Sequence, residues 1–178
     1  MEFNEALKSR RSIRKYDGSK KVTRKDMESL IEAGLLAPSW KNFETARYYV
    51  ALSDDAIKAV RDALPEFNYN NTGGAAFIAV SFVPDRSGTG LKGEPATELC
   101  HNEWGAYDLG LSTENMLLKA TELGLGTLIM GLSDREKIKE IFAIPENEIL
   151  MSVIAVGYPD INPEMPRRKK IEDVAKFI

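Results

Sequence analysis

The longest uninterrupted helical pattern in this sequence runs from Glu98 to Leu123, and no proline breaks it. Apolar side chains recur along it at helical spacing, for example Trp104, Leu111 and Leu118. Gly124 follows directly, and glycine is typical of the position after a helix C-terminus. The pattern therefore predicts one long central helix, whose apolar side chains belong to the core and not to a ligand-binding face.

Shorter segments on both sides of this helix predict a mixed α and β domain. Helices are expected from Thr23, whose cap is completed by Asp26, to Pro38, and also at Ser53–Leu64 and Ser133–Phe142. Strands are expected at Arg47–Leu52, Ala75–Val83, Leu125–Met130 and Ile149–Val156. No repeat, low-complexity stretch or linker divides these segments. Residues 1–178 are therefore predicted to form a single domain.

Composition argues against several classes of protein. With 43% apolar and 29% charged residues the chain is typical of a soluble globular domain. No apolar run approaches the roughly 20 residues that span a bilayer, and the first residues lack the features of a signal peptide. We expect a cytoplasmic protein without a membrane partner. The one cysteine, Cys100, and the one histidine, His101, exclude an internal disulfide and leave no basis for a metal site.

The formal net charge of -3, from 24 basic and 27 acidic residues, argues against a nucleic-acid partner. Two clusters depart from this balance, one between Lys8 and Arg24 and one at Arg167–Lys170. Each could be a solvated basic face. Alternatively, the two clusters could converge on one anion.

Gly88–Gly93 matches the G-x-G-x-x-G pattern of dinucleotide-binding folds. In such folds the glycines open a helix directly, so that its free N–H groups bind the pyrophosphate. Here Pro95 follows, and the next helical pattern begins only near Glu98. We therefore interpret the segment as a mobile surface loop.

Two polar segments carry more chemical information. Arg10-Arg11-Ser12-Ile13-Arg14 offers guanidinium groups and a hydroxyl that can hold a phosphate through charge-assisted bonds. Ala37–Asn42 follows the end of a helix, and its amide and hydroxyl groups could contact a heterocycle. Either segment alone is equally consistent with an ordinary surface or connection.

Together with the rest of the chain, these segments resemble the FMN-dependent nitroreductase family. The resemblance extends from about Phe3 to Phe177. Further matching motifs follow in the expected order: Trp104-x-x-x-Asp108-x-Gly110, Glu114–Ala120, Gly124–Thr127, Val156–Pro159 and the late Arg168. The resemblance implies an α+β, three-layer fold in which a mainly antiparallel sheet is flanked by helices. It also implies an intertwined homodimer with FMN in each interface groove.

The resemblance also implies which residues bind FMN. Arg10 and Ser12 would hold the phosphate and ribityl chain, with Arg11 in the same segment, and Arg14 would lie near N1 and O2 of the ring. Arg168 would add a second phosphate contact. The competing interpretation of these arginines is solvated surface charge.

The remaining predicted contacts concern the ring. Ser39 and Asn42 would reach the flavin from the other chain, and Asn68 would bind the pyrimidine edge. Leu128 would pack against the ring, while the backbone of Met130 and Gly131 would approach N5 and O4. Asn68 could equally belong to a turn, and residues 128–131 could simply form a buried strand.

The implied chemistry is hydride transfer from NADH or NADPH through flavin N5 to an electron-poor acceptor, such as a nitroaromatic or quinone, in a ping-pong cycle. No side-chain acid or nucleophile is required, so no catalytic residue is predicted. Alternatives are an FMN carrier or redox sensor with little turnover, or a specialised flavin, enone or halophenol reductase.

The sequence departs from the family pattern on the substrate side. Many members have Asn-x-Gln-Pro-Trp where this chain has Asn42-Phe43-Glu44-Thr45-Ala46. Trp40 stands where a small residue is common. Any amide contact expected at the position of Glu44 is therefore in doubt.

Overall fold

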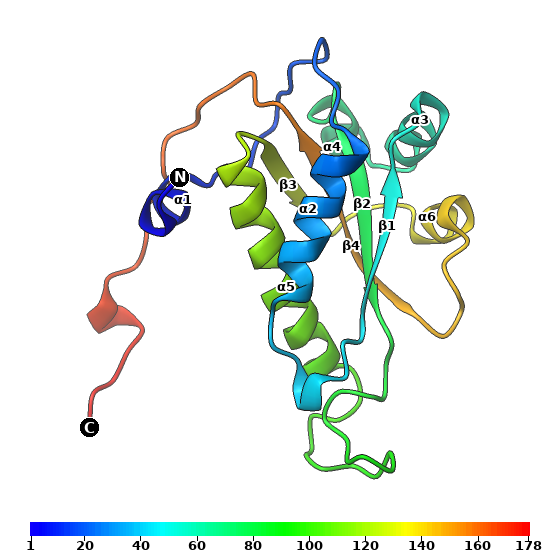
Figure 1. Cartoon of the computed structure of the whole chain (residues 1–178), viewed down its shortest axis with the longest axis vertical. Helices are drawn as coiled ribbons and strands as arrows, with labels where there is room; N and C mark the ends of the chain where they lie inside the picture. The colour runs from blue at the N-terminus through cyan, green and yellow to red at the C-terminus, as the bar shows by residue number, and fades with distance from the viewer.

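Four antiparallel strands form the centre of the computed structural model, which describes residues 1–178 (Figure 1). The strands are β1 (Ala46–Ala51), β2 (Ala76–Phe82), β3 (Gly126–Met130) and β4 (Ile149–Gly157). Their order in the sheet is β1-β2-β4-β3. All seven residues of β2 are buried, as a central strand covered on both faces requires.

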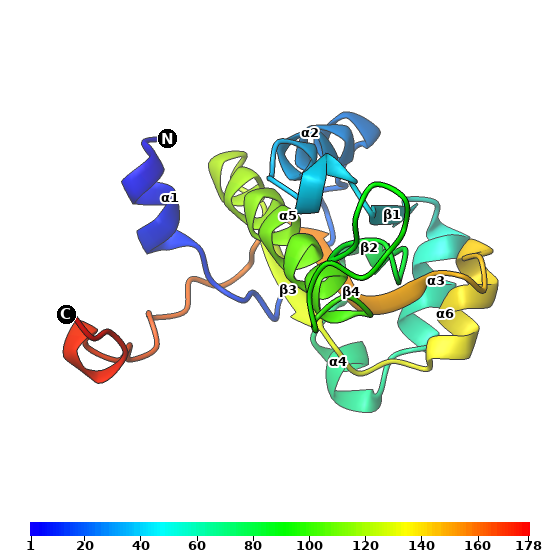
Figure 2. The same cartoon turned by 90° about the horizontal axis from the view of Figure 1, so that it is seen from below.

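Helices cover both faces of the sheet, so the molecule has three layers (Figures 1 and 2). The helices are α1 (Phe3–Ser9), α2 (Arg24–Leu35), α3 (Asp54–Asp62), α4 (Glu66–Asn70), α5 (Glu103–Glu122) and α6 (Arg135–Phe142). Ile78 and Val80 pack with the α2 and α5 face, while Phe77 and Ala79 pack with the α3 and α6 face. This alternation follows from the two-residue period of a strand. The predicted α+β fold is confirmed.

The predicted central helix is confirmed as α5, but it begins at Glu103 and not at Glu98. The carbonyl of His101 accepts the backbone N–H of Asp85, at 2.9 Å, which ties the preceding residues to a distant loop. Gly105 then brings α5 against β2, because a Cβ atom there would stand 2.5 Å from a carbon of the Phe82 ring.

Two short helices were not predicted. α1 and α4 contain too few residues to show a helical period, and α4 contains Asn68, for which a turn was the competing interpretation. The carbonyl of Pro65 accepts the N–H of Tyr69 and closes the turn of α4. The Gly88–Gly93 segment forms turns and opens no helix, but Gly88, Thr89 and Gly90 are buried, so the expectation of a surface loop is wrong for these three residues.

After β4 the chain continues as an extended tail that leads away from the body and ends with the single turn η2 (Ile171–Asp173) (Figures 1 and 2). Large apolar side chains along it are exposed, among them Val174 and Phe177. None of the helices combines the length and apolar character that crossing a bilayer would need.

Candidate functional site

The basic N-terminal segment lies along β3. Ser12 bridges Thr127 in parallel, and the N–H of Ile13 donates to the Thr127 carbonyl at 2.9 Å. Ile13 is buried between exposed Ser12 and Arg14, so the latter two side chains leave the extended segment on the same side. Tyr16 anchors the far end by donating its hydroxyl to the Ile13 carbonyl, and burial raises the pKa of that hydroxyl.

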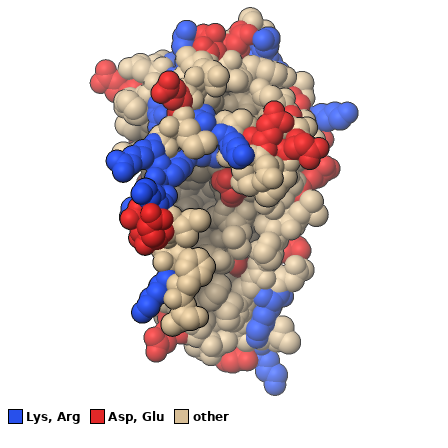
Figure 3. All heavy atoms as spheres, turned by 90° about the vertical axis from the view of Figure 1, so that its left-hand side faces the viewer, with Lys and Arg blue, Asp and Glu red and all other residues tan.

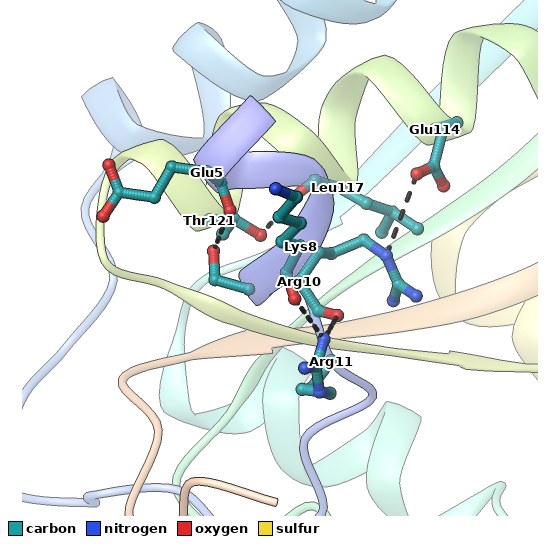
Figure 4. Close-up of polar contacts among 8 residues, drawn as sticks. Glu5, Lys8, Arg10, Arg11, Glu114, Leu117 and Thr121 are labelled. Carbon is teal, nitrogen blue, oxygen red and sulfur yellow. Dashed lines mark hydrogen bonds and ion pairs between the residues drawn. The ribbon is translucent and has the colours of Figure 1, made fainter. Parts of the chain in front are cut away.

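Arg10 extends from this segment toward α5 (Figure 4). Its Nε lies 3.8 Å from Oε1 of Glu114, whose side chain is 51% exposed. An ion pair that is this long and this exposed contributes little free energy. The guanidinium of Arg10 therefore remains available to a stronger anion.

Arg11 points back to the end of α1 (Figure 4). One terminal nitrogen donates to the carbonyls of Lys8 and Arg10, at 2.8 and 2.7 Å, and Nε is buried without a partner. Carbonyls at a helix C-terminus lack partners within the helix, and a guanidinium satisfies them well. This position gives Arg11 a structural role, and its predicted cofactor contact stays untested.

Two hollows meet near Arg10. The first, of about 550 Å³, is lined by Arg10, Arg11, Gly126 and Pro159, among others. The second, of about 320 Å³, lies between α5 and the strands β3 and β4. Glu114 lines the second hollow, so the Arg10–Glu114 pair marks the junction. Figure 3 shows Lys and Arg side chains gathered beside a hollow on this face of the molecule.

The side chains of β3 alternate between this hollow and the core. Leu128 and Met130 are 5% and 2% exposed and pack in the core on the α3 and α6 face. Ile129 is 47% exposed and lines the second hollow with Gly131. Ile129 therefore has the position predicted for Leu128, although the ring contact itself remains untested. Sequence reasoning missed it because Leu128, Ile129 and Met130 are all apolar and show no alternation.

Asn68 lies at the end of β3. Its side chain is mostly buried, on α4, and its Nδ2 donates to the carbonyl of Leu132 at 3.2 Å. The structure thus brings Asn68 beside Gly131 and Leu132 within one chain. Arg10 and Ser12 thus lie near one end of β3, and the amide of Asn68 lies near the other end.

Ser39, Asn42 and Arg168 lie elsewhere. Ser39 and Asn42 belong to the turn η1 (Trp40–Asn42) and its cap, at the end of α5 far from α1 (Figure 1). Arg168 lies in the extended tail. Within one chain the structure does not bring these three residues to Arg10.

The arrangement combines arginine side chains with a mostly apolar slot. Ile129 and Met151 are the exposed apolar side chains of the slot, and the buried Leu109 of α5 also lines it. Pockets of several hundred cubic ångströms with apolar walls and few polar groups are typical of small-molecule sites. Such a site suits a planar ring that carries an anionic group at one end.

The comparisons with known proteins agree on one family. The model described as "Nitroreductase family" matches residues 7–158. A protein from Archaeoglobus fulgidus assigned as an NADH dehydrogenase/NAD(P)H nitroreductase is 30% identical over 85% of this chain and 82% of its own. The "NADPH-flavin oxidoreductase" of Vibrio harveyi is 29% identical over 92% of this chain and 68% of its own.

A solved structure agrees with the fold. A protein from Exiguobacterium sibiricum assigned as a nitroreductase, in complex with FMN, superposes with a TM-score of 0.84. The match is 22% identical and covers 100% of this chain and 98% of the other.

The different roles of the two neighbouring arginines can be tested by hydrogen exchange. Arg11→Ala removes the donor to two carbonyls at the end of α1, so amides of residues 3–9 should exchange roughly fivefold faster, as expected for the loss of a bond of about 1 kcal/mol. Arg10→Ala removes only an exposed pair and should leave that protection unchanged. Equal protection of α1 in both variants would contradict the structural role of Arg11.

Proposed function

The chain belongs to the nitroreductase family, and from this premise we propose that it is an FMN-dependent oxidoreductase that uses NADH or NADPH. The relative from Vibrio harveyi is named for NADPH and flavin, and the solved relative from Exiguobacterium sibiricum contains FMN. The observation that carries the proposal for this chain is the junction at Arg10. There the Arg10–Glu114 pair links a hollow lined by two arginines to an apolar slot along β3.

The residues of this junction fit the two ends of FMN. Arg10 and the Ser12 hydroxyl supply charge-assisted and neutral bonds for a phosphate and ribityl chain. Ile129 supplies an apolar wall for the ring, and the amide of Asn68 lies at the far end of β3. The hollow beside Arg10 is lined by no aromatic side chain on which an adenine could stack.

FMN held at this junction would supply hydride chemistry between the nicotinamide and an electron-poor acceptor such as a nitroaromatic or quinone. The residues of the chain would bind and orient these molecules. Arg14, exposed beside Ser12, would supply positive charge near N1 and O2 of the ring, and the backbone of Met130 and Gly131 would approach N5 and O4. We propose that the reductant and the acceptor bind in turn.

A second copy of the chain completes the site in this proposal. Ser39, Asn42 and Arg168 lie away from Arg10 in one chain, and the extended tail exposes Val174 and Phe177 to solvent. An intertwined homodimer would bring the η1 turn and the tail of one chain to the grooves of the other. Both sets of residues would then serve one cofactor.

The first test concerns the cofactor. We expect the protein to purify yellow, or to take up FMN on reconstitution, with one FMN per chain, because the site binds one phosphate. Chromatography of the extracted chromophore identifies it, and anaerobic addition of each nicotinamide should bleach its absorbance. Recovery of FAD, or no flavin uptake after reconstitution, contradicts the proposal. Binding without bleaching would indicate a flavin carrier.

The second test concerns assembly. Intertwined homodimers bury on the order of 2,000 Å² or more, so sedimentation should show a dimer at all accessible concentrations. Removing residues 160–178 should weaken the dimer and the affinity for FMN together. A stable monomer with the full affinity for FMN would be incompatible with a shared site.

The third test separates the two ends of the cofactor. Arg168→Ala removes one charge-assisted phosphate bond, so the oxidised and reduced forms of FMN should bind more weakly by about 1.5–3 kcal/mol alike. Arg14→Ala removes positive charge beside N1 and O2, where negative charge develops on reduction. The flavin midpoint potential should therefore fall. If spectroelectrochemical titration found the potential lowered by Arg168→Ala and unchanged by Arg14→Ala, this assignment would be wrong.

A further inference from the structure

The loop that contains Ser39 and Asn42 has an unfavourable backbone. Lys41, Asn42 and Glu44 have φ values of 47°, 55° and 49°, in the left-handed region that side chains disfavour. Such a backbone persists only where surrounding contacts determine it, and it often marks a functional segment. The contacts that hold this loop therefore determine where Ser39 and Asn42 lie.

Asp108 of α5 provides the most buried of these contacts. Its Oδ2 accepts the backbone N–H of Trp40 at 3.0 Å and the hydroxyl of Ser87 at 2.7 Å. Asp108 is 5% exposed and Ser87 is 1% exposed, and Ser87 lies 3.4 Å from the hydroxyl of Thr45. Oδ2 of Asp108 thus connects α5 directly to Trp40 on one side of the loop, and through Ser87 to Thr45 on the other side.

A second contact acts on the Trp40 side chain. Its Nε1 donates to the carbonyl of Thr89 at 2.7 Å, and its ring lies 4.8 Å from that of Trp104, one turn before Asp108 on α5. These two residues are the only tryptophans of the chain. The emission of the tryptophans therefore reports on this loop and on the part of α5 that packs against it.

Within the loop, two local hydrogen bonds restrain Ser39 and Asn42, the two residues predicted to contact the cofactor. The N–H of Glu44 donates to the Ser39 hydroxyl at 3.1 Å, and Nδ2 of Asn42 donates to Oε1 of Glu44 at the same distance. Neither Ser39 nor Asn42 has a hydrogen bond to Asp108, so Asp108 acts on them through the backbone of Trp40 and, on the other side of the loop, through Ser87.

We infer that Asp108 is the positioning residue of this loop: its Oδ2 fixes the Trp40 backbone and so presents Ser39 and Asn42 to the flavin of the second chain. The flavin contact rests on the proposed function. Asp108 touches no cofactor and acts as a hydrogen-bond acceptor. Its negative charge is not what the loop requires.

The experiment compares Asp108→Ala with Asp108→Asn. The amide oxygen of asparagine can accept the same two bonds, whereas alanine leaves the Trp40 N–H and the Ser87 hydroxyl without an acceptor. We expect Asp108→Ala to raise the dissociation constant of FMN at least about tenfold and to shift the tryptophan emission of the flavin-free protein to longer wavelength. Asp108→Asn should stay within about threefold of the parent, with unchanged emission.

Glu148 provides the matched control. It is also mostly buried and accepts two hydroxyls, from Tyr49 at 2.8 Å and Ser81 at 2.5 Å, but it has no contact with the loop. Burial and the Glu148 contact raise the pKa of Tyr49 to about 12, so Tyr49 remains a donor. Glu148→Ala should lower the unfolding midpoint as Asp108→Ala does, while leaving the FMN affinity and tryptophan emission unchanged.

Three outcomes overturn the inference: Asp108→Ala with parental FMN affinity and emission, Asp108→Asn as defective as Asp108→Ala, or Glu148→Ala with the same loss of FMN affinity. If Asp108→Ala does not fold, Asp108→Ser replaces it, because the serine hydroxyl is too short to reach Trp40. A parent that binds no FMN contradicts the proposed function. The emission of the variants still tests the positioning of the loop in that case.

Discussion

The close approach of α5 to the centre of the sheet is the constraint on which the rest of the site depends. At Gly105 the helix lies so near β2 that a Cβ atom would overlap the Phe82 ring, and Phe82 is itself 1% exposed and cannot move aside. Leu109 and Met116 then continue the same buried face. Packing against the sheet thereby fixes the position of α5 along its axis and its rotation about that axis. It also fixes the side chains that α5 directs toward Arg10 and toward the η1 turn.

The geometry of α5 is consistent with the proposed sharing of the site between two chains. Asp108 contacts the η1 turn and Glu114 contacts Arg10. Six residues along a helix correspond to a rise of about 9 Å and a rotation of about 240°. The two contacts therefore face different sides of the helix, and the helix body stands between the segments that they hold. In the proposed homodimer, a second copy of the helix would bring the η1 turn of one chain and the Arg10 segment of the other to one small molecule.

Sequence reasoning found the elements that depend on local pattern and missed those that depend on distant partners. The uninterrupted pattern before Gly124 identified α5, but its first residue is set by the bond between His101 and Asp85, which no local pattern contains. The apolar residues of β3 predicted a strand without saying which of them face the core. In the structure Leu128 lies in the core and Ile129 lines the slot, while the ring contact predicted for Leu128 stays untested. The shift of one residue reverses the face of a strand completely.

In the basic segment Arg10–Arg14, too, the sequence does not reveal the distant partners of each side chain. The fold nevertheless gives each arginine of this charge cluster a different position. Arg10, Arg11 and Arg14 are close in sequence and equivalent by residue type. The end of α1 engages Arg11, Glu114 restrains Arg10 loosely, and the alternation around Ile13 leaves Arg14 exposed on the Ser12 side. The three guanidinium groups therefore point to a helix end, to the junction of two hollows and to the surface. In the proposed site, Arg10 would hold the phosphate, and Arg14 would place positive charge at a separate position.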